Sequence, residues 1–232
     1  MEKQKTILLF SDLEGTILRE EDSKIDPEAM YNFLSQIDKM QKLTGASVNI
    51  HLVSPVYREQ MEDVMDKIDK SIANYNIEHR KSNILIVQAG AAYPDSMIGD
   101  EFLGDRIVPL KKPINSRDFD TARYGKSYYV RTWCDMYKDN EYKNLIMAIY
   151  CGNGRNDLDA MKYIRNRKDG FVVCPQNSRQ QAKAIANFVS KKTDLFGISE
   201  GIGNINKEIE KRVYPERNKE EKKNTLPEGP EE

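Results

Sequence analysis

Short apolar runs that alternate with longer amphipathic segments most strongly constrain the fold of this chain. The first run, Thr6–Phe10, has the length and composition of a buried strand. The segment after it carries Met30, Phe33 and Ile37 at helical spacing. Strands that are apolar throughout and alternate with helices form mostly parallel sheets covered on both faces. The sequence therefore predicts a doubly wound α/β domain.

The expected elements follow this alternation to residue 209. A helix begins at the capping pair Asp26-Pro27 and ends at Gly45. The second strand is expected to stop at Ser54-Pro55. The predicted strands span residues 6–10, 48–53, 84–87, 145–150, 171–174 and 188–190. The remaining helices are expected around residues 61–72, 130–137, 158–164, 180–186 and 198–209.

Composition divides the chain into a body and a tail. The whole chain is 39% hydrophobic and 31% charged, leaner in apolar residues than an average soluble domain. From Tyr214 onward it has three prolines, mixed charges and almost no apolar residues. Such a segment cannot bury enough surface to offset its ordering entropy. We expect residues 1–213 to fold and residues 214–232 to be a disordered or loosely helical tail.

Charge and cysteine content exclude several classes of protein. A net charge of −1 gives no support for binding nucleic acid or an anionic membrane. The apolar runs are too short for a bilayer span or a signal peptide. The three cysteines lie far apart, which argues against a disulfide scaffold or a zinc site and fits a reducing cytoplasm. His51, on the second predicted strand, is expected to be packed rather than a ligand.

Chemically suggestive residues follow three of the predicted strands, and ligands of such sheets bind at the carboxyl ends of the strands. Asp12, after the first strand, could be a metal ligand, a base or a nucleophile. Glu14 returns to the same side of an extended backbone and could transfer a proton. Ser54 could bind a phosphate oxygen. Each could equally be an ordinary turn or capping residue.

The fourth strand ends in Gly152-Asn153-Gly154, where the backbone could approach a ligand closely. Asn156 and Asp157 open the helix behind it and could simply cap that helix. Lys126 precedes this strand and could neutralise the carboxylates or a phosphate. Taken singly these short motifs have little specificity, but they occur together and in order.

In that order and position the segments ILLFSDLEGTIL, HLVSP, RYGKSYYV and YCGNGRNDLDAM are similar to the motifs of a known family. The sequence resembles the haloacid dehalogenase (HAD) superfamily, in particular its Cof-type and phosphomannomutase- or sucrose-phosphatase-like branch of magnesium phosphatases. ILIVQAGAAY and CPQNSRQQAKAIANFVSKKTDLFGISEGI are further points of similarity. The resemblance covers about residues 5–212 and implies a HAD-like core.

The resemblance implies a Mg²⁺-dependent phosphomonoester hydrolase that acts on a small phosphorylated substrate. Asp12 would take the phosphoryl group as an aspartyl-phosphate, and Glu14 would be the general acid and base. Mg²⁺ would be held by Asp12, the carbonyl of Glu14 and Asn153, with Asp157 supporting the metal. The residues expected to hold phosphate oxygens are Ser54, Lys126 and Asn156.

Two residues depart from the family pattern. Glu14 replaces an aspartate and keeps the same chemistry with a longer reach. Asn153 replaces the usual metal-binding aspartate, which removes one negative charge from a site for a hard cation. The alternative is therefore a catalytically weak HAD-fold protein that binds a phosphorylated ligand or partner without turnover. Dehalogenation through Asp12 is less expected.

The family's branch carries a large cap domain after the third strand, but here residues 93–125 are too few for one. We expect a minimal lid or an ordinary loop with mixed charges. Such an open site suits a bulky phosphorylated substrate or closure by a neighbouring subunit in a homo-oligomer.

Overall fold

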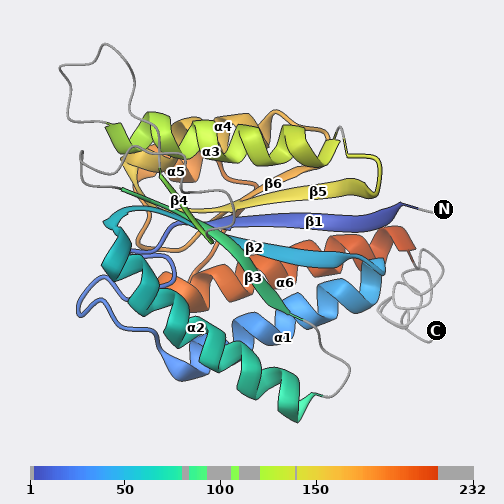
Figure 1. Ribbon diagram of the computed structural model, residues 1–232, viewed down its shortest axis with the longest axis horizontal. Helices are drawn as coiled ribbons and strands as arrows, with labels where there is room; N and C mark the ends of the chain where they lie inside the picture. Colours follow the sequence, from blue (N-terminus) through green and yellow to red (C-terminus); the bar gives the residue numbers. More distant parts are fainter. Residues whose placement is uncertain (1–2, 80–83, 93–105, 110–120, 139, 214–232) are drawn as a thin grey trace, which may run out of the picture.

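A computed structural model describes residues 3–79, 84–92, 106–109, 121–138 and 140–213 (Figure 1). Its centre is a sheet in which every strand pairing is parallel, with the order β4-β3-β2-β1-β5-β6-β7. The chain builds outward from β1 to β4, then returns to place β5 on the other side of β1. This reversal makes the sheet doubly wound and confirms the predicted α/β class. In such a sheet, the boundary between β1 and β5 is where ligands bind.

The strands agree with most of the predicted positions. They are β1 (Gln4–Ser11), β2 (Ser47–Tyr57), β3 (Leu85–Ala92), β4 (Ile107–Pro109), β5 (Lys143–Cys151), β6 (Gly170–Cys174) and β7 (Phe188–Val189). The central strands are apolar throughout because both of their faces are covered. Ile7, Leu8, Leu9 and Phe10 of β1 are all completely buried.

Helices cover both faces of the sheet. They are α1 (Pro27–Thr44), α2 (Arg58–Glu78), α3 (Thr121–Lys138), α4 (Leu158–Arg165), α5 (Gln180–Ile185) and α6 (Asp194–Val213). Figure 1 shows α1, α2 and α6 on one face and α3, α4 and α5 on the other. The core divides in the same way. Ile7 and Leu9 of β1 belong to one apolar cluster, while Leu8 and Phe10 belong to the other.

Local sequence signals place the ends of α1 as expected. Asp26 accepts hydrogen bonds from the backbone N–H groups of Glu28 and Ala29, at 2.9 and 3.0 Å. Gly45 ends the helix in the left-handed conformation, with φ of +64°. In α2, the residues predicted to share one face are buried, among them Met61 and Ile68.

The structure departs from the predicted elements in three places. β2 continues through Ser54-Pro55 to Tyr57, and its pairing with β3 is irregular between Val53 and Tyr57, where the proline has no N–H to donate. β3 includes residues 88–91, which were expected to follow it. The short strand β4 was not predicted, because three residues carry too little periodicity to be recognised.

The lid expected at residues 93–125 lies mostly outside the described residues, apart from β4, Arg106 and the beginning of α3. The expected tail, residues 214–232, lies outside them altogether. Within the described part of the chain, no helix combines the length and apolar composition that crossing a membrane requires.

Candidate active site at the carboxyl ends of β1 and β5

Two carboxylates and one ammonium group meet where β1 and β5 end. The Lys126 Nζ atom donates to Asp12 Oδ1 at 2.7 Å and to Asp157 Oδ1 at 2.8 Å. All three side chains are buried, with 0% of the Lys126 side chain and 4% of the Asp12 side chain exposed. Asp12 directly follows β1, Asp157 follows β5, and Lys126 reaches them from α3. The sheet reversal thus brings together groups that lie 114 and 31 residues apart in sequence.

Asp157 is held by donors on both of its oxygen atoms. Its Oδ1 also accepts from the Tyr150 hydroxyl at 2.8 Å. Its Oδ2 accepts from the backbone N–H groups of Asn153 and Gly154, at 3.1 and 2.8 Å. These bonds fix the turn after β5, including the backbone of Asn153. Since both oxygens are already engaged, the arrangement favours a supporting role for Asp157 over direct contact with a metal.

One ammonium shared by two buried carboxylates leaves the cluster with an excess negative charge. Burial, together with the Asp157 carboxylate, raises the pKa of Asp12 to about 7, although Lys126 opposes the shift. Burial by itself would lower the pKa of Lys126, but the two carboxylates outweigh it and the pKa is raised. Lys126 is therefore a permanent cation, and an additional positive charge at the site would favour ionised Asp12.

The loop after Asp12 is shaped by Gly15, whose φ is +65°. A side chain at this position would collide with the amide of Asn153. The loop then turns tightly, because the Leu13 carbonyl accepts from the N–H groups of Thr16, Ile17 and Leu18. The glycine therefore allows the β1 and β5 loops to lie in direct contact.

Glu14 and Ser54 form the exposed side of the site. The Ser54 hydroxyl, buried in β2, donates to Glu14 Oε2 at 2.9 Å. The Glu14 side chain is itself exposed and can reach solvent or a substrate. The structure thus brings Glu14 and Ser54 together beside the loop that carries Asp12, while their roles in catalysis and phosphate binding stay predictions.

Asn153 and Asn156 occupy the turn between β5 and α4, and both are half-buried. The Asn153 amide lies against Gly15, on the side of the turn that faces Asp12's loop. Asn156 belongs to a short 3-10 helix (Arg155–Asp157), with its side-chain oxygen near Gly154. Within the described residues no hydrogen bond joins Asn156 to Asp12 or Lys126, so its phosphate-binding role stays a prediction.

The oxygen atoms near Asp12 can be compared with the needs of Mg²⁺. The expected ligands, namely the Asp12 carboxylate, the Glu14 carbonyl and the Asn153 amide oxygen, would provide one charged and two neutral donors. This set fits Mg²⁺, which commonly keeps several water ligands and uses few carboxylates. Among the described residues no group of three His, Cys, Asp or Glu side chains is arranged to hold a metal ion. The expected ligand set thus carries less negative charge than a site built from acidic residues, and its binding of Mg²⁺ stays a prediction.

Two residues of the site were not singled out from the sequence. Tyr150 looks like an ordinary core residue of β5, and only the structure reveals its bond to Asp157. Asn177, in the loop after β6, donates to the Gly15 carbonyl at 3.1 Å and to Asp194 Oδ1 at 2.9 Å. The segment CPQN is similar to a family motif, but that similarity predicts no role for its asparagine.

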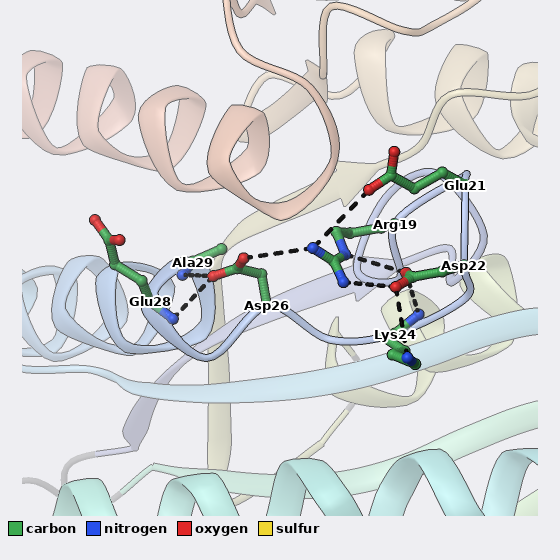
Figure 2. A network of polar contacts seen from close by, with 7 residues as sticks. All are labelled: Arg19, Glu21, Asp22, Lys24, Asp26, Glu28 and Ala29. Atoms are coloured by element: carbon green, nitrogen blue, oxygen red, sulfur yellow. Dashed lines mark hydrogen bonds and ion pairs between the residues drawn. The ribbon is translucent and has the colours of Figure 1, made fainter.

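A separate ion network anchors the loop between β1 and α1 (Figure 2). The Arg19 guanidinium binds both oxygens of Asp22, at 3.1 and 2.6 Å, and lies 3.9 Å from Glu21 and from Asp26. Asp26 is also the residue that caps α1. The positive charge of Arg19 is thus neutralised by carboxylates between β1 and α1.

No protein-family model and no curated protein matches the sequence, but several solved structures do. A haloacid dehalogenase-like hydrolase from Bacillus subtilis is 15% identical with a TM-score of 0.47, over 88% of this chain and 90% of that chain. A Thermoplasma acidophilum protein is 15% identical with a TM-score of 0.45, over 90% of this chain and 99% of that one. The 3-deoxy-D-manno-octulosonate 8-phosphate phosphatase of Moraxella catarrhalis, in complex with magnesium and phosphate ions, is 13% identical with a TM-score of 0.43, over 88% and 85%. Likenesses this distant do not support an activity.

Proposed function

We propose that this chain is a phosphomonoester hydrolase in which Asp12 is the nucleophile. The observation that carries the proposal is the buried contact of Asp12 with Lys126, which is shared with Asp157 at the end of the sheet where ligands of doubly wound folds bind. Such a fixed cation orients a carboxylate and offsets the charge of an incoming phosphate. Together with the order of the motifs, this favours a phosphatase of the HAD type.

The proposed reaction has two steps, each with its own proton transfer. An Asp12 oxygen attacks phosphorus, the bond to the leaving alcohol oxygen breaks, and Glu14 gives that oxygen its proton. Glu14, now a carboxylate, takes a proton from water, which attacks the phosphorus of the aspartyl-phosphate. The bond from phosphorus to Asp12 then breaks and inorganic phosphate leaves. Glu14 is exposed, so both the leaving alcohol and water can reach it, and its hydrogen bond with Ser54 orients its carboxyl group.

Mg²⁺ is the proposed cofactor, held by the Asp12 carboxylate, the Glu14 carbonyl and the Asn153 amide oxygen. It would supply positive charge that offsets the repulsion between Asp12 and the phosphate. Asp157 would contribute by holding Lys126 and the backbone of the Asn153 turn in place. Ser54, Lys126 and Asn156 are the proposed partners of the phosphate oxygens.

A second function is favoured by Asn153. An amide in place of a carboxylate weakens the attraction of the site for a divalent cation. In this alternative the site binds a phosphorylated ligand or partner and turns it over slowly or not at all.

Hydrolysis of an aryl phosphate, measured with and without Mg²⁺, separates the two functions. The phosphatase proposal expects Mg²⁺-dependent turnover that Asp12→Asn abolishes. Asp63→Asn is the matched control, because Asp63 lies on α2 in an exposed ion pair. Turnover that survives Asp12→Asn would contradict the proposed nucleophile.

The variant Asn153→Asp tests the alternative. If the wild type is inactive and Asn153→Asp gains turnover, the binding function is supported and the enzyme proposal fails. Asn144→Asp, at an exposed position of β5, controls for the added charge. Closure of the site by a neighbouring subunit also stays a proposal, which sedimentation equilibrium would test directly.

A further inference from the structure

Arg131, Arg155, Arg165 and Arg179 form no ion pair within the described structure, and of these Arg155 lies two residues from Asn153 while the Arg179 backbone bonds to it. The side chains of Arg155 and Arg179 are exposed. Most other described arginines are paired with a carboxylate, as Figure 2 shows for Arg19. The paired arginines are Arg19, Arg58, Arg106, Arg167 and Arg212.

The backbones of the two arginines lie next to the same residue, Asn153, and come from different elements. Arg155 comes two residues after Asn153, in the turn that Asp157 holds. Arg179 begins α5, and its backbone N–H donates to the Asn153 carbonyl at 3.0 Å. Both arginines therefore stand beside Asn153, whose amide lies against the loop that follows Asp12.

The loop that carries Arg179 is fixed on the site. Asn177 joins this loop to the Gly15 carbonyl and to Asp194, and it also accepts the Asp194 N–H at 3.1 Å. With the bond from Arg179 to Asn153, the loop is tied to both the β1 and the β5 sides of the site. These ties fix the backbone of Arg179 next to the turn that carries Asn153.

The local balance of charge points in the same direction. Asp12 and Asp157 share Lys126, so the buried cluster has no cation left for a second anion. Next to it, Asn153 adds no negative charge, and the two residues whose backbones adjoin Asn153 each carry a positive charge. Arginine is suited to such a place because its planar fork binds carboxylate and phosphate oxygens in pairs.

We propose that Arg155 and Arg179 form a second anion-binding subsite, and that the substrate is a phosphomonoester carrying a further carboxylate or phosphate group. This inference rests on the proposed phosphatase function, in which the first phosphate lies at Asp12 and Lys126. The second anionic group would extend from it toward the β5 and β6 loops.

The test measures binding of non-hydrolysable phosphonates by titration calorimetry, with Mg²⁺ present. Phosphonoacetate, 3-phosphonopropionate and 4-phosphonobutyrate are each compared with the alkylphosphonate of equal chain length, so that the spacing need not be known. The wild type is expected to prefer the carboxylate-bearing member of at least one pair by about tenfold. Propylene diphosphonate is measured as well, and its affinity shows whether the subsite prefers a second phosphate-like group or a carboxylate.

Arg155→Gln and Arg179→Gln are each expected to reduce that preference at least about threefold. Arg165→Gln is the matched control, because Arg165 is exposed at the opposite end of α4. Equal affinity within every pair, an unchanged preference in both variants, or no phosphonate binding would each overturn the subsite. If the protein hydrolyses an aryl phosphate but does not prefer the carboxylate-bearing phosphonates, the phosphatase proposal is supported and the subsite is contradicted. The preference without turnover would support the subsite and contradict the enzyme.

Discussion

Lys126 is the residue on which the candidate site most depends, since two buried carboxylates share its single charge. Its removal would leave Asp12 and Asp157 close together without compensation. Leaving a buried charge without its partner costs about 3–5 kcal/mol of folding stability. We therefore predict that Lys126→Met lowers the free energy of unfolding by about 3 kcal/mol, measured by urea denaturation.

The control for this variant is Lys67→Met, which removes a lysine from an exposed ion pair on α2. Exposed pairs contribute about 0–1 kcal/mol, so its stability should change little. Adding Asp157→Asn to Lys126→Met should recover part of the lost stability, because one of the two buried charges is removed. A Lys126→Met protein as stable as Lys67→Met would contradict the charge balance described for the site.

A comparison of Gly15 with Gly45 separates two costs of adding a side chain: the strain of a positive φ and the collision with a neighbouring residue. Both have nearly the same positive φ, +65° and +64°, but only Gly15 faces the Asn153 amide, whereas the space around Gly45 is open. Alanine in this conformation costs about 1 kcal/mol. Gly45→Ala should show that cost alone. Gly15→Ala should lose at least about 1 kcal/mol more, measured by urea denaturation, because Asn153 must move. Equal losses would show that the contact is unimportant.

Some residues of the site could be identified from the sequence and others could not. Asp12, Glu14 and Ser54 follow apolar strands, so their position at one edge of a parallel sheet could be inferred. Tyr150 and Asn177 could not be assigned in this way. Tyr150 looks like a core residue, and Asn177 acts through contacts with Gly15 and Asp194 that are distant in sequence.

At the scale of elements, the long strands and helices were predictable because each has a clear apolar period. The ends of strands were less predictable. Proline at 55 removes one hydrogen-bond donor but does not force the chain out of an extended conformation, so β2 continues to Tyr57. Sequence also did not show that Lys126 lies on α3, because the apolar residues that mark that helix begin after it.

The contact between α3 and β2 makes a prediction about pH. His51 of β2 bonds through Nδ1 to the Tyr129 hydroxyl of α3, at 3.1 Å, and packs against Trp133 and Phe10. Its Nε2 has no hydrogen-bond partner among the residues that the structure describes. Burial, helped by the Lys143 charge, lowers the pKa of His51 to about 3. Because the unfolded chain binds this proton near the ordinary pKa of 6.5, stability should fall as the pH drops below 6.5 toward 3.

Urea denaturation of the wild type and of His51→Leu, between pH 7.5 and 5, measures this contribution. The unfolding free energy of the wild type minus that of His51→Leu should fall as the pH is lowered, by about 1.4 kcal/mol per pH unit below 6.5. His79→Gln is the matched control, since it removes the chain's other histidine at the end of α2. A difference that stays constant with pH would show that His51 is protonated equally in both states.

For the whole molecule, the order of the strands explains why distant residues form one site. The order in which strands are added reverses between β4 and β5, so the chain returns to β1 and places Asp157 close to Asp12, 145 residues away in sequence, with Lys126 bound to both. This doubly wound arrangement could be predicted from the alternation of elements. The net charge of −1 does not predict the charge of the site, because positive and negative residues are unevenly distributed over the molecule. Carboxylates gather around Lys126, while Arg155 and Arg179 lie beyond Asn153.

The stereochemical course of hydrolysis at phosphorus tests the proposed nucleophile most directly. The measurement uses a phosphate ester made chiral with oxygen isotopes, hydrolysed by the wild-type protein in isotopically labelled water with Mg²⁺. Transfer to Asp12 and then to water consists of two in-line displacements, each of which inverts the configuration. The account predicts overall retention of configuration in the released phosphate. Inversion would show that water attacks the substrate directly, and would contradict an aspartyl-phosphate on Asp12.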